Sequence, residues 1–369
     1  MSGSPSLLTT LENHYLPPLA RVAHAGHVKR CLSGLPSSQV DLDPGRMAVA
    51  FYCLGSLDLL KMVQEKISQT DRESWREWIW EQQTRGKYGS GFRPSPFMAG
   101  SMLSEGARYT DYDMPHIIMT YTALLTLAIL RDDFSRLDKQ GILSFLKACQ
   151  REDGSFSTVP GSGETDLRTL YCAFVISHLL NDWSGVDADG ALSFIASCRS
   201  YEGGYGQSAH CEANGGTTYI AMAAIHLAPV TSNPLSPSEI RKTIEWAVHK
   251  QHQSGGFCGR TNKLADACYC FWIAGSLKIL GAGDLVNSRS LAVFLSSCQF
   301  KFGGISKAPG EHPDPYHTYL SLAALSMFPP PLYDNDTNSS SWAFEPLDPL
   351  INARKETAEW ARSHIAIKE

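Results

Sequence analysis

CRSYEGGYG, at residues 198–206, is one copy of a glycine-rich turn that recurs along the sequence. Three further copies are CQREDGSFS (149–157), KQHQSGGFCG (250–259) and CQFKFGGIS (298–306). The last glycine of each copy falls at 154, 204, 256 and 304, so the spacings are 50, 52 and 48 residues. A looser copy, GKYGSGFRP, occupies residues 86–94. A regular period of this length indicates one supersecondary unit, repeated so that each copy buries its apolar face against its neighbours.

Each turn is followed by a strongly apolar segment and then by an amphipathic one. The apolar segments have the composition of helices covered on both sides, and they are 47–62, 116–130, 165–180, 216–227, 265–280 and 316–327. The amphipathic segments have apolar residues at helical spacing and a polar outer face, and they are 71–83, 139–149, 188–198, 237–249 and 288–298. An open solenoid should show polar caps at both ends. The pattern therefore predicts an all-α fold, a closed α/α barrel of six helical hairpins with inner and outer helix rings.

The repeats define the predicted domain organisation. We expect a single barrel domain over residues 41–369, preceded by an N-terminal helical arm at 1–40 that lies outside the repeats. Surface insertions are predicted at about 94–106 and 329–347, and a closing helix at 353–366. The chain of 369 residues is long enough for a sizeable core.

Composition and charge give no reason to propose nucleic acid or a membrane as a partner. With 43% hydrophobic residues, 19% charged residues and a net charge of −5, nothing favours nucleic acid or an anionic membrane surface. No apolar run approaches the roughly 20 residues of a membrane helix. The N-terminus lacks the pattern of a signal peptide. Ten scattered cysteines are simplest as free thiols in a reducing compartment, so a cytoplasmic location is expected.

The segment GRTNKLADACYCFW, at residues 259–272, concentrates the chemistry. Asp266 and Cys268 are two residues apart, so they can share a metal only if Asp266 lies at a helix start. His317 occupies the equivalent helix start of the next repeat and is the best third ligand. This set suits Zn²⁺ with an open fourth position. The alternative is a capping aspartate, a buried thiol and a hydrogen-bonded histidine.

Two cations in the same segment suggest an anion site. Arg260 and Lys263 could hold a diphosphate, with Tyr269 donating a hydrogen bond, or they could belong to a solvated loop. Aromatic residues recur on the predicted inner helices at Tyr52, Tyr121, Tyr171, Tyr219, Trp272 and Tyr319. They could pack the core or line a lumen that holds a long apolar ligand.

Over roughly residues 40–330 the sequence resembles the β subunits of protein prenyltransferases. The motifs that carry the resemblance are RTNKLADACYCFW (260–272), GETDLRTLYCAF (163–174), EANGGTTY (212–219), YDMPHIIMTYT (112–122) and YHTY (316–319). The resemblance implies an α/α barrel that works only with a helical-hairpin α subunit. It also implies transfer of a farnesyl or geranylgeranyl group to a cysteine near the C-terminus of a protein, in a C-a-a-X motif.

The resemblance assigns roles residue by residue. The residues implied to carry the reaction are Asp266, Cys268 and His317 as zinc ligands, and Tyr269. The implied diphosphate ligands are Arg260, Lys263, Tyr269 and Lys307. The implied cluster for the peptide's terminal carboxylate, linked through water, is His116, Glu164 and Arg168. The implied isoprenoid pocket is lined by Ala48, Tyr52, Tyr171, Trp272 and Leu320. In one departure, Asn214 stands where the family has a histidine that contacts the diphosphate, and His210 is the candidate to compensate.

Three positions distinguish branches of the family. Ala48 stands where farnesyltransferases carry Trp, and Leu320 stands where they carry Tyr, so both changes enlarge the pocket for a 20-carbon chain. Lys307 stands where farnesyltransferases have an Asp that binds Mg²⁺, so Mg²⁺ is not expected to be required. The carboxylate-reading cluster is absent from Rab-directed type II enzymes. The resemblance therefore implies a type I geranylgeranyltransferase, with geranylgeranyl diphosphate and proteins such as Rho/Rac-type small GTPases as substrates, X often being Leu.

Three alternatives remain at this level. The first is a farnesyltransferase β subunit, which would use farnesyl diphosphate and require Mg²⁺. The second is a terpene cyclase, whose proton-initiated chemistry needs a D-x-D-D motif that the sequence does not contain. The third is a helical-repeat scaffold without catalytic activity, which would bind no stoichiometric zinc.

Overall fold

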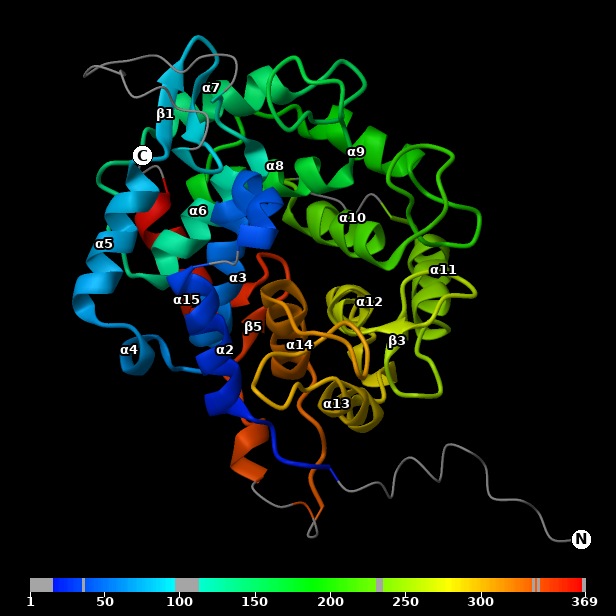
Figure 1. The fold of residues 1–369 in the computed structure, drawn as a ribbon. Helices are drawn as coiled ribbons and strands as arrows, with labels where there is room; N and C mark the ends of the chain where they lie inside the picture. Colours follow the sequence, from blue (N-terminus) through cyan, green and yellow to red (C-terminus); the bar gives the residue numbers. More distant parts are fainter. Residues whose placement is uncertain are drawn as a thin grey trace, which may run out of the picture.

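Two concentric rings of helices make up the body of the molecule (Figure 1). The computed structural model describes residues 16–34, 37–96, 113–229, 235–333, 336 and 339–366. The inner ring consists of α3 (Arg46–Leu59), α6 (Ile117–Ile129), α8 (Leu167–Leu180), α10 (Gly215–Leu227), α12 (Ala267–Ile279) and α14 (Pro315–Met327). Each inner helix packs against the next, and α14 packs against α3. The ring is therefore closed, as the sequence pattern predicts.

The outer ring covers the inner one. Its members are α2 (Arg21–Ser33), α5 (Gln69–Trp80), α7 (Lys139–Cys149), α9 (Ala188–Ser197), α11 (Pro237–Val248) and α13 (Ser288–Ser297). Five of these match predicted amphipathic segments within a few residues. Each of those five begins at a residue whose side chain accepts a backbone hydrogen bond, namely Ser68, Asp138, Asp187, Ser236 and Asn287. Local capping thus reinforces the periodicity that made these helices predictable.

The sixth outer helix, α2, corrects the predicted place of the N-terminal arm. The arm was expected to lie outside the repeats, yet α2 packs on α3 and against the last glycine-rich turn. The backbone N–H of Gly304 donates to His24 Nδ1 at 2.9 Å, and His24 Nε2 donates to Gln299 Oε1 at 2.9 Å. Ala20 N–H donates to the same Gln299 oxygen at 2.8 Å. The chain therefore completes its sixth hairpin with an outer helix from its own beginning.

The glycine-rich turns share one backbone geometry. The glycines that take a positive φ and lie against the backbone of the adjacent outer helix are Gly89, Gly154, Gly203, Gly255 and Gly303. The sequence-based alignment paired Gly154 with residues 204, 256 and 304, so the structure shifts it by one residue. In each turn, the residue two positions after this glycine bridges back across the turn, as in Arg199↔Tyr205 and Gln251↔Phe257.

Inner-helix threonines fasten the turns. The N–H groups of Phe92, Tyr205 and Ile305 donate to the hydroxyls of Thr120, Thr218 and Thr318, each at 2.9 Å. Each hydroxyl belongs to the first turn of an inner helix. The turns and the inner-helix starts therefore lie at the same end of the ring.

Short strands, which the all-α prediction did not include, occur at two of the turns and in a C-terminal hairpin. They are β1 (Gln83–Gly86), β2 (Gly89–Phe92), β3 (Phe257–Cys258), β4 (Ala265–Asp266), β5 (Leu347–Asp348) and β6 (Ala353–Arg354), and they pair antiparallel in sequence order. They are too short to form a separate layer, and the fold class remains all-α.

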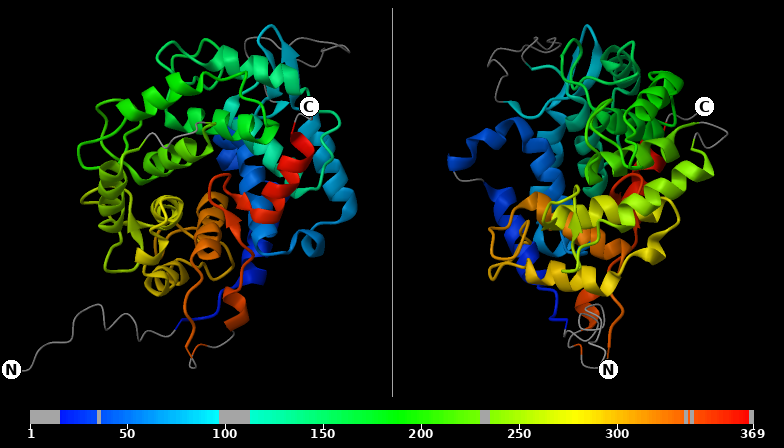
Figure 2. Two further views of the ribbon diagram at one scale, coloured as in Figure 1. Left: turned by 180° about the vertical axis from the view of Figure 1, so that it is seen from behind. Right: turned by 90° about the vertical axis from the view of Figure 1, so that its right-hand side faces the viewer.

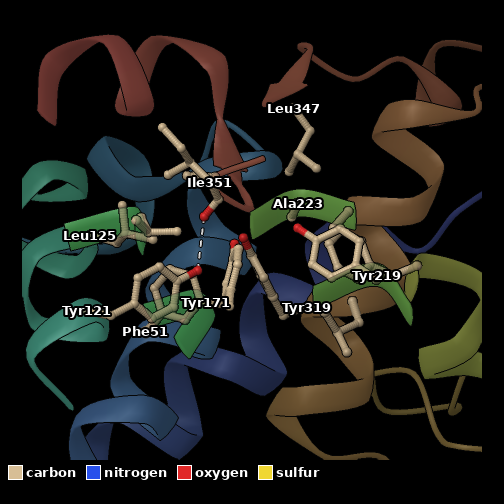
Figure 3. Close-up of a cluster of buried hydrophobic side chains, with 14 of the residues drawn as sticks. Phe51, Tyr121, Leu125, Tyr171, Tyr219, Ala223, Tyr319, Leu347 and Ile351 are labelled. Atoms are coloured by element: carbon tan, nitrogen blue, oxygen red, sulfur yellow. Dashed lines mark hydrogen bonds between the residues drawn. The ribbon is translucent and has the colours of Figure 1, made fainter. Parts of the chain in front are cut away.

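A C-terminal hairpin lies against the buried tyrosines of the inner helices (Figure 3). Four inner-helix tyrosines donate hydroxyl hydrogen bonds to four consecutive carbonyls between β5 and β6. The pairs are Tyr219 to Pro349 at 2.6 Å, Tyr171 to Leu350 at 2.9 Å, Tyr121 to Ile351 at 2.9 Å and Tyr319 to Asn352 at 2.6 Å. The predicted closing helix follows as α15 (Lys355–Ile365), which packs on α6 and α8 (Figure 2).

The two predicted insertions differ in what the structure describes. Most of the first, 94–106, falls in 97–112, outside the described residues. Within the second, 329–347, Asp336 accepts from Leu16 N–H at 3.1 Å and from Arg289 Nη2 at 2.9 Å. This segment therefore joins the N-terminal segment to α13. No helix in the described part of the chain is long and apolar enough to cross a membrane.

We expect the docking of α2 to weaken in mild acid. Burial lowers the pKa of His24 from 6.5 to about 4. The neutral ring also fits its surroundings, since Nδ1 accepts a hydrogen bond from Gly304 N–H. The unfolded chain binds this proton more readily, so stability is complete above about pH 6.5 and is lost as the pH falls toward 4. The expected loss is about 2 kcal/mol of unfolding free energy at roughly pH 5.

Urea denaturation at pH 7 and at pH 5 measures the unfolding free energy of the wild-type protein and of a His24→Gln variant that cannot titrate. The difference between the two proteins isolates the contribution of His24 to the pH dependence. If the wild-type protein and the variant lose the same unfolding free energy between pH 7 and pH 5, the assignment to His24 is wrong.

Candidate active site

The start of α12 brings Asp266 and Cys268 together. Asp266 is the N-cap residue, in extended conformation, and its Oδ1 accepts a hydrogen bond from Cys268 N–H at 2.9 Å. The carboxylate therefore folds back over the first helical turn beside the thiol. This geometry meets the condition that the two-residue spacing imposes on a shared metal.

His317 reaches the same place from the neighbouring inner helix. It lies in the first turn of α14, three residues after the N-cap Asp314. Its Nδ1 donates to Asp314 Oδ2 at 2.6 Å, and its Nε2 lies 3.5 Å from Asp266 Oδ1. One ligand atom from each of Asp266, Cys268 and His317 lies within 4.8 Å of the others. The structure thus brings together the three residues predicted as a zinc site.

The electrostatics of this cluster fit a bound cation. Burial and the neighbouring Asp266 charge raise the pKa of the Cys268 thiol far above its ordinary value. Burial acts against a charged imidazole, but hydrogen bonds to Asp266 and Asp314 raise the pKa of His317 to about 9. Asp266 and Cys268 offer a carboxylate oxygen and a sulfur to the same point as His317 Nε2, and zinc supplies positive charge in sites with these donors. The donor set therefore fits Zn²⁺.

Asp314 is the site residue that sequence reasoning missed. It caps α14 through its Oδ1, which accepts from His317 N–H at 2.8 Å, and orients the imidazole through its Oδ2. A histidine ligand commonly donates its second N–H to such a carboxylate. The available signal was the Asp-Pro pair before Tyr316-His317, because Pro favours the first helical position and the residue before it is then the cap.

We expect Asp314→Asn to weaken zinc binding about 10- to 100-fold, because the neutral amide orients His317 less strongly and removes charge. Asn still caps helices well, so thermal stability should change little. Competition with a chromogenic chelator measures the affinity. The matched control is Asn287→Ala, which removes the cap of α13 without touching the cluster. Equal zinc affinity in Asp314→Asn and wild type would contradict the role given to Asp314.

A cationic cavity of about 400 Å³ adjoins the cluster. The four residues predicted to bind diphosphate all line it, namely Arg260, Lys263, Tyr269 and Lys307. Lys307 arrives from the next repeat because its carbonyl accepts from Ala267 N–H at 2.9 Å. Arg260 makes an exposed ion pair with Glu212 at 2.7 Å, so an incoming anion can compete for it. The cavity also includes Asp266 in its lining, which places the anion site beside the metal ligands.

Asn214, which stands where the family has a histidine, holds a residue of the cavity in place. It is the N-cap of α10, and its Nδ2 donates to Tyr269 OH at 3.1 Å. Because Tyr269 accepts this bond, its own hydroxyl proton is available to a ligand in the cavity. His210 is exposed and is not among the cavity-lining residues, so nothing places it as a substitute for the missing histidine.

The residues predicted to hold the lipid lie on the inner helices and differ in how far they are buried. Ala48, Tyr52 and Trp272 are partly exposed, and Tyr316 joins the last two, accepting from Trp272 Nε1 at 3.0 Å and packing on Tyr52 with ring centres 5.3 Å apart. Tyr171 lies deeper, bound to the C-terminal hairpin. Leu320 is fully buried, at 0% exposure, so contact with a lipid would need neighbouring side chains to move.

The predicted carboxylate-reading residues come from two neighbouring inner helices. His116 is the N-cap of α6, and its buried Nδ1 has no hydrogen-bond partner among the described residues. Arg168 lies in the first turn of α8, where its guanidinium pairs with the buried Asp166. Glu164 is exposed and raises the pKa of Arg168 electrostatically, after the larger effect of Asp166. Among the described residues, no hydrogen bond joins His116 directly to the other two.

Comparisons with known proteins agree with this architecture. The chain matches the prenyltransferase alpha-alpha toroid domain over residues 19–353. It is 37% identical over 314 residues to a Dictyostelium discoideum protein named geranylgeranyl transferase type-1 subunit beta, covering 81% of this chain and 88% of that one. An Arabidopsis thaliana protein of the same name is 42% identical over 219 residues, 58% of each chain.

Two further similarities are to a farnesyltransferase subunit and to a geranylgeranyltransferase structure. The Schizosaccharomyces pombe protein farnesyltransferase subunit beta is 30% identical over 341 residues, covering 88% of this chain and 81% of the relative. The solved structure of Candida albicans protein geranylgeranyltransferase-I complexed with GGPP superimposes with a TM-score of 0.81 at 27% identity. That match covers 94% of this chain and 99% of the other.

Proposed function

Because the chain belongs to the prenyltransferase α/α toroid family, we propose that it is the catalytic β subunit of a zinc-dependent protein geranylgeranyltransferase type I. The observation that carries the proposal is the adjacency of two sites at one end of the ring. Asp266, Cys268 and His317 form a metal-binding group, and the cationic cavity beside them includes Asp266 in its own lining. A reaction between a thiol and a diphosphate ester needs these two sites side by side.

The reaction forms a thioether bond between the substrate cysteine sulfur and C1 of the geranylgeranyl group. The bond between C1 and the diphosphate oxygen breaks, and the thiol proton is released. When bound to Asp266, Cys268 and His317, zinc supplies the Lewis acidity that keeps a thiol deprotonated at neutral pH.

The residues of the cavity act on the leaving group. Arg260, Lys263 and Lys307 offer positive charge to the diphosphate oxygens, and the Tyr269 hydroxyl offers a hydrogen bond. These groups are in place before the reaction, so the growing negative charge on the diphosphate is stabilised with little reorganisation. Burial raises the pKa of Tyr269, which keeps the phenol protonated and able to donate.

Specificity is proposed to reside away from this centre. Ala48, Tyr52 and Trp272 offer apolar surface to the isoprenoid, and the extra five carbons of a 20-carbon chain are worth a few kcal/mol at about 0.8 per buried methylene. His116, Glu164 and Arg168 are proposed to receive the terminal carboxylate of a C-a-a-X protein, such as a Rho/Rac-type small GTPase, through water. An α subunit completes the enzyme. The ten cysteines are all free thiols, which suits a cytoplasmic location.

A paired-substrate assay tests the proposal. The chain is co-expressed with an α subunit and supplied with geranylgeranyl or farnesyl diphosphate and with C-a-a-Leu or C-a-a-Ser peptides. We expect the geranylgeranyl and Leu combination to have the highest kcat/KM. A preference for farnesyl diphosphate and the Ser peptide, with a requirement for Mg²⁺, would instead establish a farnesyltransferase β subunit.

We expect transfer to proceed without added Mg²⁺, because the Lys307 ammonium in the cavity supplies the charge that Mg²⁺ would otherwise provide. In Lys307→Asp the charge at this position is reversed, and activity should become dependent on Mg²⁺. Titration of Mg²⁺ into both proteins at fixed zinc measures the effect. Strong Mg²⁺ activation of the wild type would show that Lys307 does not have this role.

A further inference from the structure

Lys250 is a buried cation that follows α11, behind the loop that carries two of the cavity cations. Its side chain is only 8% exposed. Its Nζ donates to Thr261 Oγ1 at 2.8 Å and lies 4.8 Å from the centre of the Trp246 ring. Within the described ranges, no carboxylate oxygen lies within 4.0 Å of it. A buried ammonium without a carboxylate is unfavourable unless other groups hold it.

The Trp246 ring that faces this ammonium is itself fixed by the preceding turn. Its Nε1 donates to Glu202 Oε2 at 3.3 Å, and the ring is 6% exposed. The ring also lies against Gly204, where an added Cβ would come within 2.7 Å of it. The aromatic face therefore cannot swing away, and the cation–π contact holds Lys250 in one place.

Thr261 is at the middle of the loop that carries Arg260 and Lys263. The loop, residues 259–264, joins β3 to β4 (Figure 1). The pairs Phe257↔Asp266 and Cys258↔Ala265 hold its two ends. Asn262 turns the chain with φ 58° immediately after Thr261. Thr261 is otherwise exposed, so its bond to Lys250 ties the middle of the loop to the body of the protein.

Charge favours such a tie. The cavity is lined by three cations, Arg260, Lys263 and Lys307, and by two acids, Asp266 and Glu311, so positive charge is in excess. The loop itself carries only cations, of which Arg260 pairs with the exposed Glu212 outside the loop, and Lys307 repels the loop until an anion arrives. A loop held only at its ends would relieve this repulsion by opening outward, and it would then have to be reordered on binding. The ammonium of Lys250 also adds positive potential from behind the loop.

We infer that Lys250 is a positioning residue for the anion-binding loop: through Thr261 it holds Arg260 and Lys263 at the cavity before an isoprenoid diphosphate binds. The inference rests on the proposed function, which supplies the diphosphate as the anion. It adds two residues, Lys250 and Thr261, that do not contact the substrate and set the affinity of those that do.

Binding measurements on the heterodimer test the inference. The dissociation constants of geranylgeranyl diphosphate and of inorganic diphosphate are measured for wild type, Lys250→Met, Lys250→Arg and Thr261→Val. We expect Lys250→Met and Thr261→Val each to weaken both ligands about tenfold, and Lys250→Arg to stay within about threefold. The double variant Lys250→Met with Thr261→Val should be no weaker than Lys250→Met alone, because the two residues act through one contact.

Two controls separate positioning from other effects. Lys301→Met removes an exposed lysine that faces the Phe302 ring on a different turn, and it should leave both constants unchanged. Zinc content of Thr261→Val should equal that of wild type, because Thr261 is not one of the metal-binding residues. Its melting temperature should fall, because the buried Lys250 ammonium loses its hydrogen bond, but a cooperative transition shows that the variant is folded. If Lys250→Met does not fold, Thr261→Val alone decides the question.

Wild-type affinity in Thr261→Val would overturn the inference even if Lys250→Met binds weakly, because Lys250 would then act by charge alone. Failure of Lys250→Arg to restore binding would overturn it as well. Binding of inorganic diphosphate can be measured whether or not the protein transfers an isoprenoid, so this test does not depend on the outcome of the transfer assay. A wild-type protein that binds inorganic diphosphate and transfers no isoprenoid contradicts the proposed function, and the comparison of Lys250 variants can still be read from it.

Discussion

Replacing Cys268 with serine is expected to abolish stoichiometric zinc binding and to lower the rate of prenyl transfer at least about a thousandfold, or about 4 kcal/mol in the barrier. Cys268 is 6% exposed and offers the soft ligand among the three converging side chains. Serine keeps the shape, but its hydroxyl is a poor zinc ligand at neutral pH because its pKa is far above that of a thiol.

The measurement has two readouts on the same heterodimer, zinc content by atomic emission and single-turnover transfer. Affinity for geranylgeranyl diphosphate should remain close to that of wild type, because Cys268 is not among the residues that line the cationic cavity. This combination separates loss of the metal from general misfolding.

Cys270→Ser is the matched control for this experiment. Cys270 lies on the same helix, is fully buried, and contacts the Asp266 carbonyl at 4.0 Å through its sulfur. A serine hydroxyl can donate to the same carbonyl, so zinc content and activity should be retained. Full activity of Cys268→Ser, or an active wild-type heterodimer without stoichiometric zinc, would contradict the catalytic metal site.

Gly303→Ala is expected to be the most destabilising single-methyl change at the closure of the ring. Gly303 has φ 92°, and a Cβ there would lie 1.9 Å from the carbonyl oxygen of Ala23 in α2. Neither the turn nor the helix backbone can yield without losing the bonds that join them, which include the one from Gly304 N–H to His24. We expect a loss on the order of 4 kcal/mol of unfolding free energy, from strain and from displacement of α2.

Gly310→Ala separates the cost of backbone strain at a positive φ from the cost of the close approach to α2. Gly310 also has a positive φ, 85°, but nothing lies within 4 Å of a Cβ built on it. Its substitution should cost only about 1 kcal/mol, the strain of the backbone conformation. Urea denaturation gives both free energies, and hydrogen exchange of the α2 amides reports whether this helix detaches. Equal losses in the two variants would show that α2 is not held by this close approach.

The sequence predicted that the ring closes but not that the N-terminal arm supplies its sixth outer helix, and the reason lies in the range of the interactions. The amphipathic pattern of 139–149 or 288–298 is local, and it identified α7 and α13 within a residue. The sixth outer helix has a weak pattern, and its partner Gly303 lies about 280 residues away. Only the closed ring brings His24 to Gln299, so the place of the N-terminal arm could not be predicted from periodicity.

Within the active site, too, local sequence patterns predicted which residues gather but not all of the contacts between them. The residue types and their positions at helix starts predicted Asp266, Cys268 and His317 as a group, because inner-helix starts converge at one end of a ring. Asp314 was missed because its role depends on which way the imidazole of His317 turns, and a capping aspartate has the same appearance in sequence. The resemblance supplied Lys307, and the structure gives the physical reason for its place, a backbone bond from Ala267 across the repeat boundary.

The amino-acid sequence alone determined the repeat, the all-α class, the two helix rings and the residues that carry charge and metal-binding chemistry. These depend on composition and on spacing along a few helical turns, which are local properties. The tertiary structure decided how the ring closes, that four tyrosines bind the C-terminal hairpin, and that Lys250 holds the cationic loop through Thr261. The ring closure and the tyrosine contacts join residues from different repeats or from the two ends of the chain, so their geometry exists only once all six hairpins are packed together. Lys250 and Thr261 are 11 residues apart, and their contact depends on how the loop between β3 and β4 folds.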